Sequence, residues 1–304
     1  MPAAPSIVDS DMLSLLSSRS ALAGIAFMCF GMAMFSFNDV MGKWLLGTYG
    51  VGQLLLIRSA AALVVLAPAI AREGVGAMLN PPRPWLQLLR VVLTTTEVAF
   101  FYWAVIYMPL ADAVTFYLAG PIYVAVLAGP LLGERVPLRR WIAIGIGFVG
   151  VVIALNPGGA VFGLPALIAF LGSVGFAFVM IITRKLRGTS DTSLVASQTI
   201  AALVLGLVMV PFSWVTPTMF DFALLSLLGI VAMFAHVATN RSLKLAPAST
   251  VVPYQYTLIA WAVVLGYVVF GDIPGWTTIL GAGIIVAAGI WIFRDEARGG
   301  LPTI

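Results

Sequence analysis

Long apolar segments constrain this chain more than any other feature of its sequence. A helix needs about 20 apolar residues to cross the roughly 30 Å hydrocarbon layer of a membrane. The 304 residues contain ten segments of about that length, and nearly all of them end at charges, Gly or Pro. These segments lie near residues 21–45, 51–71, 85–107, 110–132, 138–155, 163–183, 191–213, 219–240, 247–270 and 275–293. The sequence therefore predicts an all-α membrane protein with ten transmembrane helices.

Composition agrees with this class, because 61% of the residues are hydrophobic and only 9% are charged. In soluble domains about a quarter of the residues are charged. The first twenty residues contain two aspartates, several serines and one arginine, but no compact apolar region followed by a cleavage site, which argues against a removable signal peptide. Cys29 is the only cysteine, which excludes an intrachain disulfide and a cysteine-cluster metal site.

Lysine and arginine residues alternate between the connecting segments. They occur before span 1, after span 10 and in the loops 2–3, 4–5, 6–7 and 8–9, whereas the opposite loops lack them. The exceptions are Lys43, near the end of span 1, and Arg58, within span 2. By the positive-inside rule both termini are expected to be cytoplasmic. The net charge of +4 is therefore interpreted as a topology signal and not as a sign of nucleic-acid binding.

The chain also repeats itself weakly at a fixed offset. A shift of 138 residues superposes seven identical pairs, among them Pro109 with Pro247 and Gly145 with Gly283. This pattern predicts two five-helix units, residues 1–158 with an N-terminal tail at 1–20, and residues 159–304. Because five is odd, the second unit enters the membrane from the opposite side, so the units are inverted copies. Inverted repeats are typical of secondary transporters, whose substrate site lies near the midplane between the halves.

One segment follows the fourth span of each unit, "GERVPLRRWIAIGIGFVG" in the first and "GDIPGWTTILGAGIIVAAG" in the second. These segments resemble the corresponding part of the drug/metabolite transporter superfamily, EamA type. The resemblance covers nearly the whole chain, and within the superfamily the chain is most similar to bacterial inner-membrane exporters of amino acids and related metabolites. Asp272 departs from the family pattern, which leads us to expect Glu there. The resemblance implies a multi-pass inner-membrane transporter, surrounded by lipid, that takes a small-molecule substrate and no cofactor.

Four aromatic residues predict one wall of a central cavity. Tyr254 and Trp261 are seven residues apart and hence share a helical face, and the repeat places Phe116 and Tyr123 at the equivalent positions. Two interpretations stay open, because the four side chains either line the cavity or pack between helices without a ligand. The next residue of the repeat pairs Gln255 with Tyr117, and the direction in which that pair points is left open.

Glu97 is the only carboxylate predicted to lie well away from both membrane surfaces. A charge at the membrane centre costs about 2.5–3.5 kcal/mol. Protonating a glutamate at pH 7 costs roughly 3.7 kcal/mol, so energetics leave open whether Glu97 is neutral, paired or facing water. In the cavity it could accept a substrate ammonium group or exchange a coupling proton. The alternative is a protonated structural residue.

Asn38, near the outer end of span 1, and His236, in span 8, complete the predicted substrate site. His236 and Asn240 are four residues apart, so a satisfied structural pair explains them equally well, and a lone histidine is not a metal site. Lys43 and Arg58 face one local carboxylate, Asp39, and either snorkel to the membrane surface or attract a substrate carboxylate.

The expected function is alternating-access export of small amphipathic metabolites, with amino acids bearing apolar or aromatic side chains as the expected substrates. A carrier of carboxylates or nucleotide sugars is the alternative. An intramembrane enzyme would need a nucleophile–base pair or a metal cluster, and the sequence contains neither an H-E-x-x-H nor a G-x-S-x-G motif. "GIGFVG" at 145–150 lies inside a span with no preceding strand, so it does not indicate a dinucleotide site. The sequence leaves proton coupling and oligomeric state open.

Overall fold

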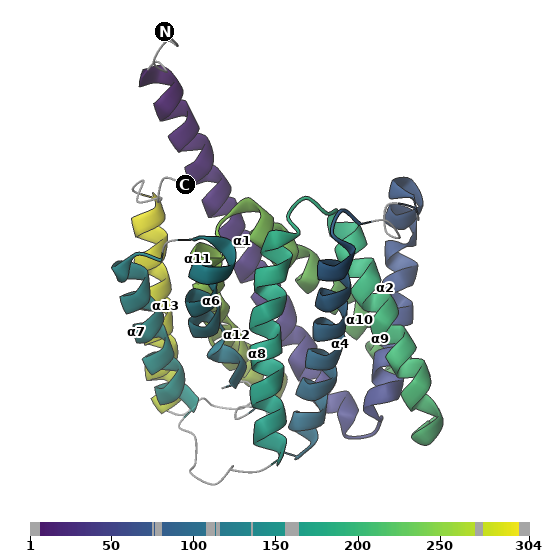
Figure 1. Ribbon diagram of the computed structural model, residues 1–304. Coiled ribbons are helices and arrows are strands. Elements are labelled where there is room, and N and C mark those ends of the chain that lie inside the picture. Colours follow the sequence, from purple (N-terminus) through teal and green to yellow (C-terminus); the bar gives the residue numbers. More distant parts are fainter. Residues whose placement is uncertain are drawn as a thin grey trace.

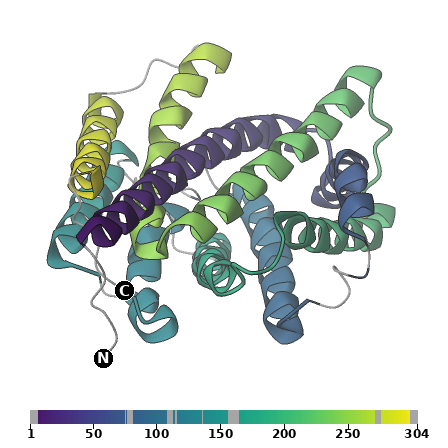
Figure 2. The same cartoon turned by 90° about the horizontal axis from the view of Figure 1, so that it is seen from above.

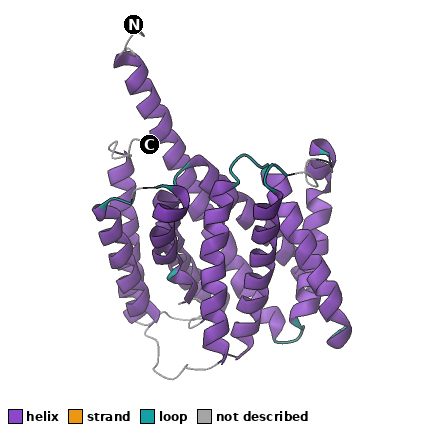
Figure 3. Ribbon diagram, viewed as in Figure 1, coloured by secondary structure: helices purple, strands orange, loops and turns teal. Residues whose placement is uncertain are grey.

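The computed structural model describes residues 7–74, 76, 81–107, 113, 116–134, 136–155, 164–270 and 276–297. Within these ranges every regular element is helical and no strand occurs (Figure 3). The elements are α1 (Ile7–Leu46), α2 (Val51–Glu73), α4 (Pro84–Tyr107), α6 (Gly120–Leu132), α7 (Leu138–Leu155), α8 (Leu164–Lys185), α9 (Asp191–Met209), η1 (Val210–Phe212), α10 (Met219–Leu245), α11 (Ala248–Val251), η2 (Val252–Tyr256), α12 (Thr257–Phe270) and α13 (Trp276–Ala297). The predicted all-α class is confirmed.

Six helical spans of the described part of the chain are long and apolar enough to cross a membrane. They are Arg19–Leu46, Val51–Glu73, Pro84–Tyr107, Leu164–Lys185, Asp191–Phe212 and Met219–Leu245. The four other predicted spans correspond to α6, to α7, to α11 with η2 and α12, and to α13. The count of ten transmembrane helices stays a prediction.

The helices form a bundle in which α1 begins and α13 ends on the same side, which we call the termini side (Figure 1). Long packing interfaces join α1 with α10, α2 with α9, α4 with α8, and α7 with α13. Seen from above, α1 and α10 run next to each other across the molecule (Figure 2). The centre of the bundle therefore lies where α1, α4, α8 and α10 meet.

Glycines allow α2 to approach its two neighbours closely. A Cβ atom on Gly206 of α9 would lie 2.6 Å from the backbone nitrogen of Leu56, and one on Gly229 of α10 would collide with the backbone of Arg58. Because small residues let helix backbones meet, these contacts hold α2 against α9 and α10. They also fix the position of Arg58 at the centre of the bundle.

The helical segment that follows α10 is interrupted. Pro247 precedes the single turn α11, and Pro253 stands in the 3₁₀ segment η2 before α12 begins. Proline has no backbone N–H, so it favours such breaks. Backbone that departs from the α-helix is tolerated in a membrane only where it faces protein or a cavity. The break places Gln255 at the interior of the bundle, where it is 3% exposed.

Candidate functional site

A central cavity lies between the helices of the two predicted units. Its empty volume is about 720 Å³, including the space that opens to solvent. The lining residues come from α1, α2, α4, α8, α10, η2, α12 and the turn before α6: Met32, Phe35, Asn38, Asp39, Arg58, Glu97, Val98, Phe101, Tyr102, Tyr117, Leu118, Phe176, His236, Gln255 and Leu258. An apolar wall with a few converging polar groups is typical of a small-molecule site.

Arg58 is held in this cavity by a relay of hydrogen bonds. Its Nη1 donates to the Tyr102 hydroxyl at 2.5 Å, which donates to Asn38 Oδ1 at 3.1 Å. Asn38 Nδ2 donates in turn to the carbonyl oxygen of Leu228 at 3.0 Å. The relay ties α2, α4, α1 and α10 together. It leaves most of the guanidinium's five N–H donors available to a ligand.

Asp39 and Glu97 face the same space from α1 and α4. Among the described residues, neither carboxyl group takes part in a hydrogen bond or an ion pair. Glu97 and Arg58 are each only 8% exposed. Buried charges are costly unless they are paired, so groups of a ligand that pair with them bind favourably. Two carboxyl groups and one guanidinium complement a ligand that carries one anionic group and up to two cationic groups.

A row of three aromatic rings forms another part of the wall. Phe101 of α4 and Tyr117 lie edge to face with their centroids 5.2 Å apart, and Tyr117 lies 6.0 Å from Phe176 of α8. The Tyr117 hydroxyl donates to the backbone oxygen of Glu97 at 3.2 Å. A Cβ atom on Gly172 would collide with that hydroxyl, so the glycine leaves the room that Tyr117 occupies.

Three of the seven predicted site residues line this cavity, namely Asn38, Glu97 and His236. His236 lies edge to face with Phe35, with the ring centroids 5.1 Å apart. Its predicted neighbour Asn240 points elsewhere, because Asn240 Oδ1 accepts a hydrogen bond from Arg90 at 3.0 Å. His236 and Asn240 therefore do not form the structural pair that the sequence left open.

The four predicted aromatic residues lie outside the lining of the cavity. Phe116 packs against a cluster of buried alanines, and Tyr123 lies edge to face with Phe170 at 6.3 Å. Tyr254 is 4% exposed within the main hydrophobic core, whereas Trp261 is 38% exposed. The adjacent pair of the repeat, Tyr117 and Gln255, lines the cavity instead. Tyr102 was not predicted as part of the site, because no spacing of residues along the chain points to its place in the cavity lining.

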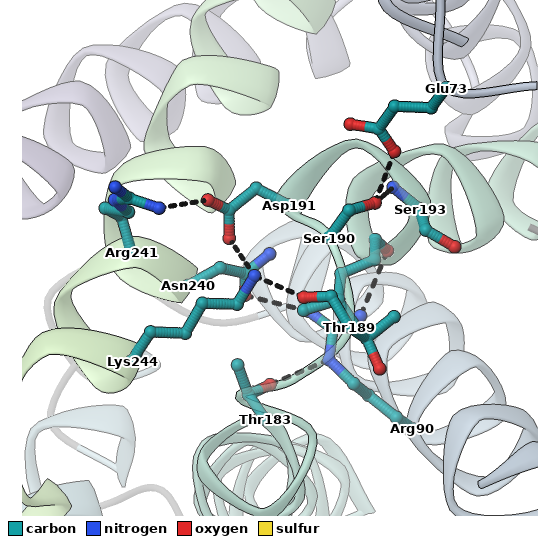
Figure 4. A network of polar contacts seen from close by, with 11 residues as sticks. Glu73, Arg90, Thr183, Thr189, Ser190, Asp191, Ser193, Asn240, Arg241 and Lys244 are labelled. Atoms are coloured by element: carbon teal, nitrogen blue, oxygen red, sulfur yellow. Dashed lines mark hydrogen bonds and ion pairs between the residues drawn. The ribbon is translucent and has the colours of Figure 1, made fainter. Parts of the chain in front are cut away.

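A network of polar contacts joins the helix ends on the termini side (Figure 4). Arg90 of α4, which is 1% exposed, donates to Thr183 Oγ1 at 2.7 Å, to the Leu194 carbonyl at 3.1 Å and to Asn240. Lys244 Nζ lies 2.7 Å and Arg241 Nη1 lies 3.6 Å from the carboxylate oxygens of Asp191. These contacts bind α4, α8, α9 and α10 to one another.

Glu134 adds a second set of contacts on the termini side. Its carboxylate lies 3.4 Å from Arg184 and accepts hydrogen bonds from the backbone nitrogens of Ala248 and Ser249 at 3.2 and 3.1 Å. A carboxylate is favoured there because the first N–H groups of a helix have no partner within it. Arg184 Nη1 also donates to the Leu243 carbonyl at 2.9 Å. The start of α11 is thus tied to α8 and α10.

On the opposite side, the described contacts join α1 and α2 to the start of α10. The Tyr49 hydroxyl donates to Asp221 Oδ2 at 2.7 Å, and this hydrogen bond raises the pKa of Tyr49 because its proton is shared with a carboxylate. The Gln53 side chain both donates to and accepts from the backbone of Val215.

Comparison with known proteins agrees with this architecture. The model of the EamA-like transporter family matches residues 22–156 and again residues 163–294. A crystal structure of another protein has the same fold, with a TM-score of 0.76 and 17% sequence identity over 92% of this chain and 98% of that one.

Three relatives are similar over most of their length. The S-adenosylmethionine uptake transporter of Rickettsia prowazekii is 27% identical over 283 residues, which are 92% of this chain and 95% of that protein. The riboflavin transporter of Rhizobium johnstonii is 27% identical over 290 residues, 94% and 95% of the two chains. The pseudopaline exporter CntI of Pseudomonas aeruginosa is 25% identical over 289 residues, 93% and 99%. The chain therefore belongs to the EamA-like transporter family, and it is a multi-pass transport protein of the inner membrane and not an enzyme.

Proposed function

We propose that this protein is an alternating-access carrier of amphoteric metabolites, which bear a carboxylate together with one or more cationic groups. The observation that carries the proposal is that Arg58, Asp39 and Glu97 face one cavity and that neither carboxyl group is paired within the described residues. The substrate carboxylate binds the guanidinium, whose fork of donors matches a carboxylate. The substrate ammonium group binds Glu97.

The aromatic wall accommodates the rest of the substrate. Phe35, Phe101 and Phe176 present apolar surface beside the charged groups. Amino acids with apolar or aromatic side chains, the substrates expected from the sequence, have this combination of a charged head and an apolar body. Asn38 acts through Tyr102 and positions Arg58, while His236 borders the space occupied by the substrate.

S-adenosylmethionine is the first larger ligand to test. It carries an ammonium group, a sulfonium group and a carboxylate, and so matches two carboxyl groups and one guanidinium. The name of the Rickettsia relative supports this choice. Riboflavin, the substrate named for another relative, has no charged group at neutral pH and so offers no charged partner to Arg58, Asp39 or Glu97.

The fold of the carrier consists of two inverted units, residues 1–158 and 159–304. Two observations support this part of the proposal. The family model matches once in each unit. The helices of the two units also pack against each other in a symmetric way. The first helix of each unit packs on the third helix of the other, as α1 does on α10 and α8 does on α4. The second helices, α2 and α9, pack together, and so do the fifth helices, α7 and α13. In many transporters, alternating access is a movement of one such repeat against the other around the substrate site.

The termini side is cytoplasmic in this proposal, and net transport is outward. Arginines and lysines at the helix ends of that side support the orientation, including Arg72, Arg184 and Arg294. With Cys29 replaced, a cysteine at Thr216 is expected to react with an impermeant thiol reagent in intact cells, whereas one at Gly188 is not. Labelling at Gly188 would contradict this orientation.

Counterflow in liposomes tests the substrate class. Purified protein is reconstituted with unlabelled phenylalanine or S-adenosylmethionine inside, and entry of the labelled compound is followed. Exchange of both compounds is expected, with none in protein-free liposomes and none for riboflavin. Exchange of riboflavin without exchange of either amphoteric compound would contradict the proposal.

A further inference from the structure

Gln255 carries a buried amide group that the protein leaves unpaired. The side chain is 3% exposed, lines the central cavity and stands in the 3₁₀ segment η2. Neither its Oε1 nor its Nε2 has a hydrogen-bond partner among the described residues. Leaving buried polar atoms unpaired is costly, so native proteins rarely do so without a reason.

Another buried glutamine shows how such a group is normally satisfied. Gln53 is fully buried in α2, and its amide both donates to the carbonyl and accepts from the N–H of Val215. The amide of Gln255 has no such backbone partner among the described residues. Gln255 lines the cavity, and its amide oxygen lies beside Gly120 without a hydrogen-bond partner among the described residues. A ligand that enters the cavity can supply the missing donor and acceptor together.

The surroundings of this amide suit a flat ring. Tyr117 and Phe176 lie in the same part of the wall, with their ring centroids 6.0 Å apart. Gly120, at the start of α6, borders the amide, because a Cβ atom there would lie 3.3 Å from Gln255 Oε1 and 3.9 Å from Phe176 Cδ1. A side chain at position 120 would therefore crowd the amide.

We propose that Gln255 recognises the edge of a planar nitrogen heterocycle that offers a hydrogen-bond donor next to an acceptor, as adenine does. A primary amide presents one donor and one acceptor side by side and pairs with adenine through two hydrogen bonds. Aromatic side chains stack on such rings, which places the ring against Tyr117 and Phe176. The inference rests on the proposed function, since the amino-acid head of the same substrate occupies Arg58, Asp39 and Glu97.

A matched pair of ligands tests this inference. S-adenosylmethionine and S-methylmethionine carry the same ammonium, sulfonium and carboxylate groups, but only the first has a heterocycle. Their inhibition constants are measured against labelled S-adenosylmethionine in liposomes that contain the wild-type protein or Gln255→Leu. The wild type is expected to prefer S-adenosylmethionine. In Gln255→Leu the ratio of the two inhibition constants is expected to change about tenfold against S-adenosylmethionine, while the constant for S-methylmethionine stays unchanged.

Gln87→Leu is the control, because Gln87 is also a buried glutamine of the bundle but bonds to Ser197 away from the cavity. It is expected to keep the wild-type ratio of the two constants. Gln255→Met, whose side chain has nearly the length of glutamine, replaces Gln255→Leu if the leucine variant unfolds.

The outcomes separate this inference from the proposed function. A wild type that binds both ligands equally, or an unchanged ratio in Gln255→Leu, overturns the role of Gln255 and leaves the amphoteric substrate class standing. A wild type that binds neither ligand overturns the inference, and it overturns the proposed function as well if phenylalanine is not exchanged either.

Discussion

Two groups of charged residues, buried or partly buried, differ in how their charges are paired. On the termini side, Arg90 meets three acceptors from three other helix regions, and Asp191 and Glu134 each face at least one cation. In the cavity, the carboxyl groups of Asp39 and Glu97 form no hydrogen bond or ion pair within the described part of the chain. Both groups are enclosed by helices of both predicted units, so burial alone does not distinguish them.

The difference teaches that the pairing of the charged groups, and not the presence of charge, marks the candidate site. The paired charges of the termini side hold helix ends in one arrangement, because breaking these pairs leaves several buried groups without partners. Unpaired groups raise the energy of the empty protein, and a ligand lowers it by binding them. Substitutions in the two groups should therefore affect different measurements, stability in the first and substrate affinity in the second.

The largest effect is expected for Arg90→Met. The variant leaves Thr183 Oγ1, Asn240 Oδ1 and the Leu194 carbonyl without their donor, at about 1–3 kcal/mol each, so stability should fall by about 3 kcal/mol or more. Thermal unfolding of the purified protein measures this loss. Arg241→Met removes a half-exposed cation that lies 3.6 Å from Asp191 and should cost under about 1 kcal/mol. Equal losses in the two variants would contradict a structural role for the Arg90 contacts.

The next effect is expected for Arg58→Gln. Loss of a buried guanidinium that binds a substrate carboxylate should weaken binding about a hundredfold, or roughly 2.7 kcal/mol. The concentration dependence of counterflow for phenylalanine checks this value. Arg83→Gln serves as the matched control, because Arg83 is exposed beside the carbonyl of Lys185, and its transport should equal that of the wild type. A wild-type KM in Arg58→Gln would remove the guanidinium from the site.

The all-α, multi-pass architecture of the protein could be predicted from the sequence because it depends on the length of apolar runs. Apolar runs must become helices in a membrane, where every backbone group needs a partner within the segment. The contacts of Arg90 could not be predicted in this way. Its partners come from α8, α9 and α10, and no spacing along the chain reveals which side chains three separate helices bring to one point.

The aromatic residues show why the interior was harder to predict. Placing Tyr254 and Trp261 on one face assumed a continuous α-helix between them. The 3₁₀ segment η2 instead turns by about 120° per residue and not about 100°, so the faces before and after it are rotated relative to each other. The repeat nevertheless pointed within one residue of the cavity, at Tyr117 and Gln255. The signal was present, but its helical phase was lost at Pro253.

A smaller effect is expected for Glu97→Gln, which keeps the shape of the side chain but cannot ionise. If Glu97 binds the substrate ammonium group, the KM for phenylalanine should rise about tenfold, or about 1.4 kcal/mol. Inhibition by 3-phenylpropionate, which lacks the ammonium group, should stay unchanged. Loss of the response to an imposed pH gradient in the same variant would assign proton coupling to Glu97 as well. Unchanged phenylalanine kinetics between pH 6 and 8 would exclude Glu97 from the site.

The smallest effect is expected for two glycines of α8 that lie almost one turn apart. A Cβ atom on Gly172 collides with the Tyr117 hydroxyl, whereas one on Gly175 lies at an ordinary 3.9 Å from Glu97 Cβ. Gly172→Ala should therefore push the Tyr117 ring into the cavity and lower substrate affinity by a few-fold, under about 1.4 kcal/mol. Gly175→Ala should match the wild type in the same counterflow assay. If both variants lose affinity equally, the effect comes from α8 as a whole. A loss confined to Gly172→Ala would show that the ring of Tyr117, which belongs to the cavity and not to the paired network, sets the space available to the substrate.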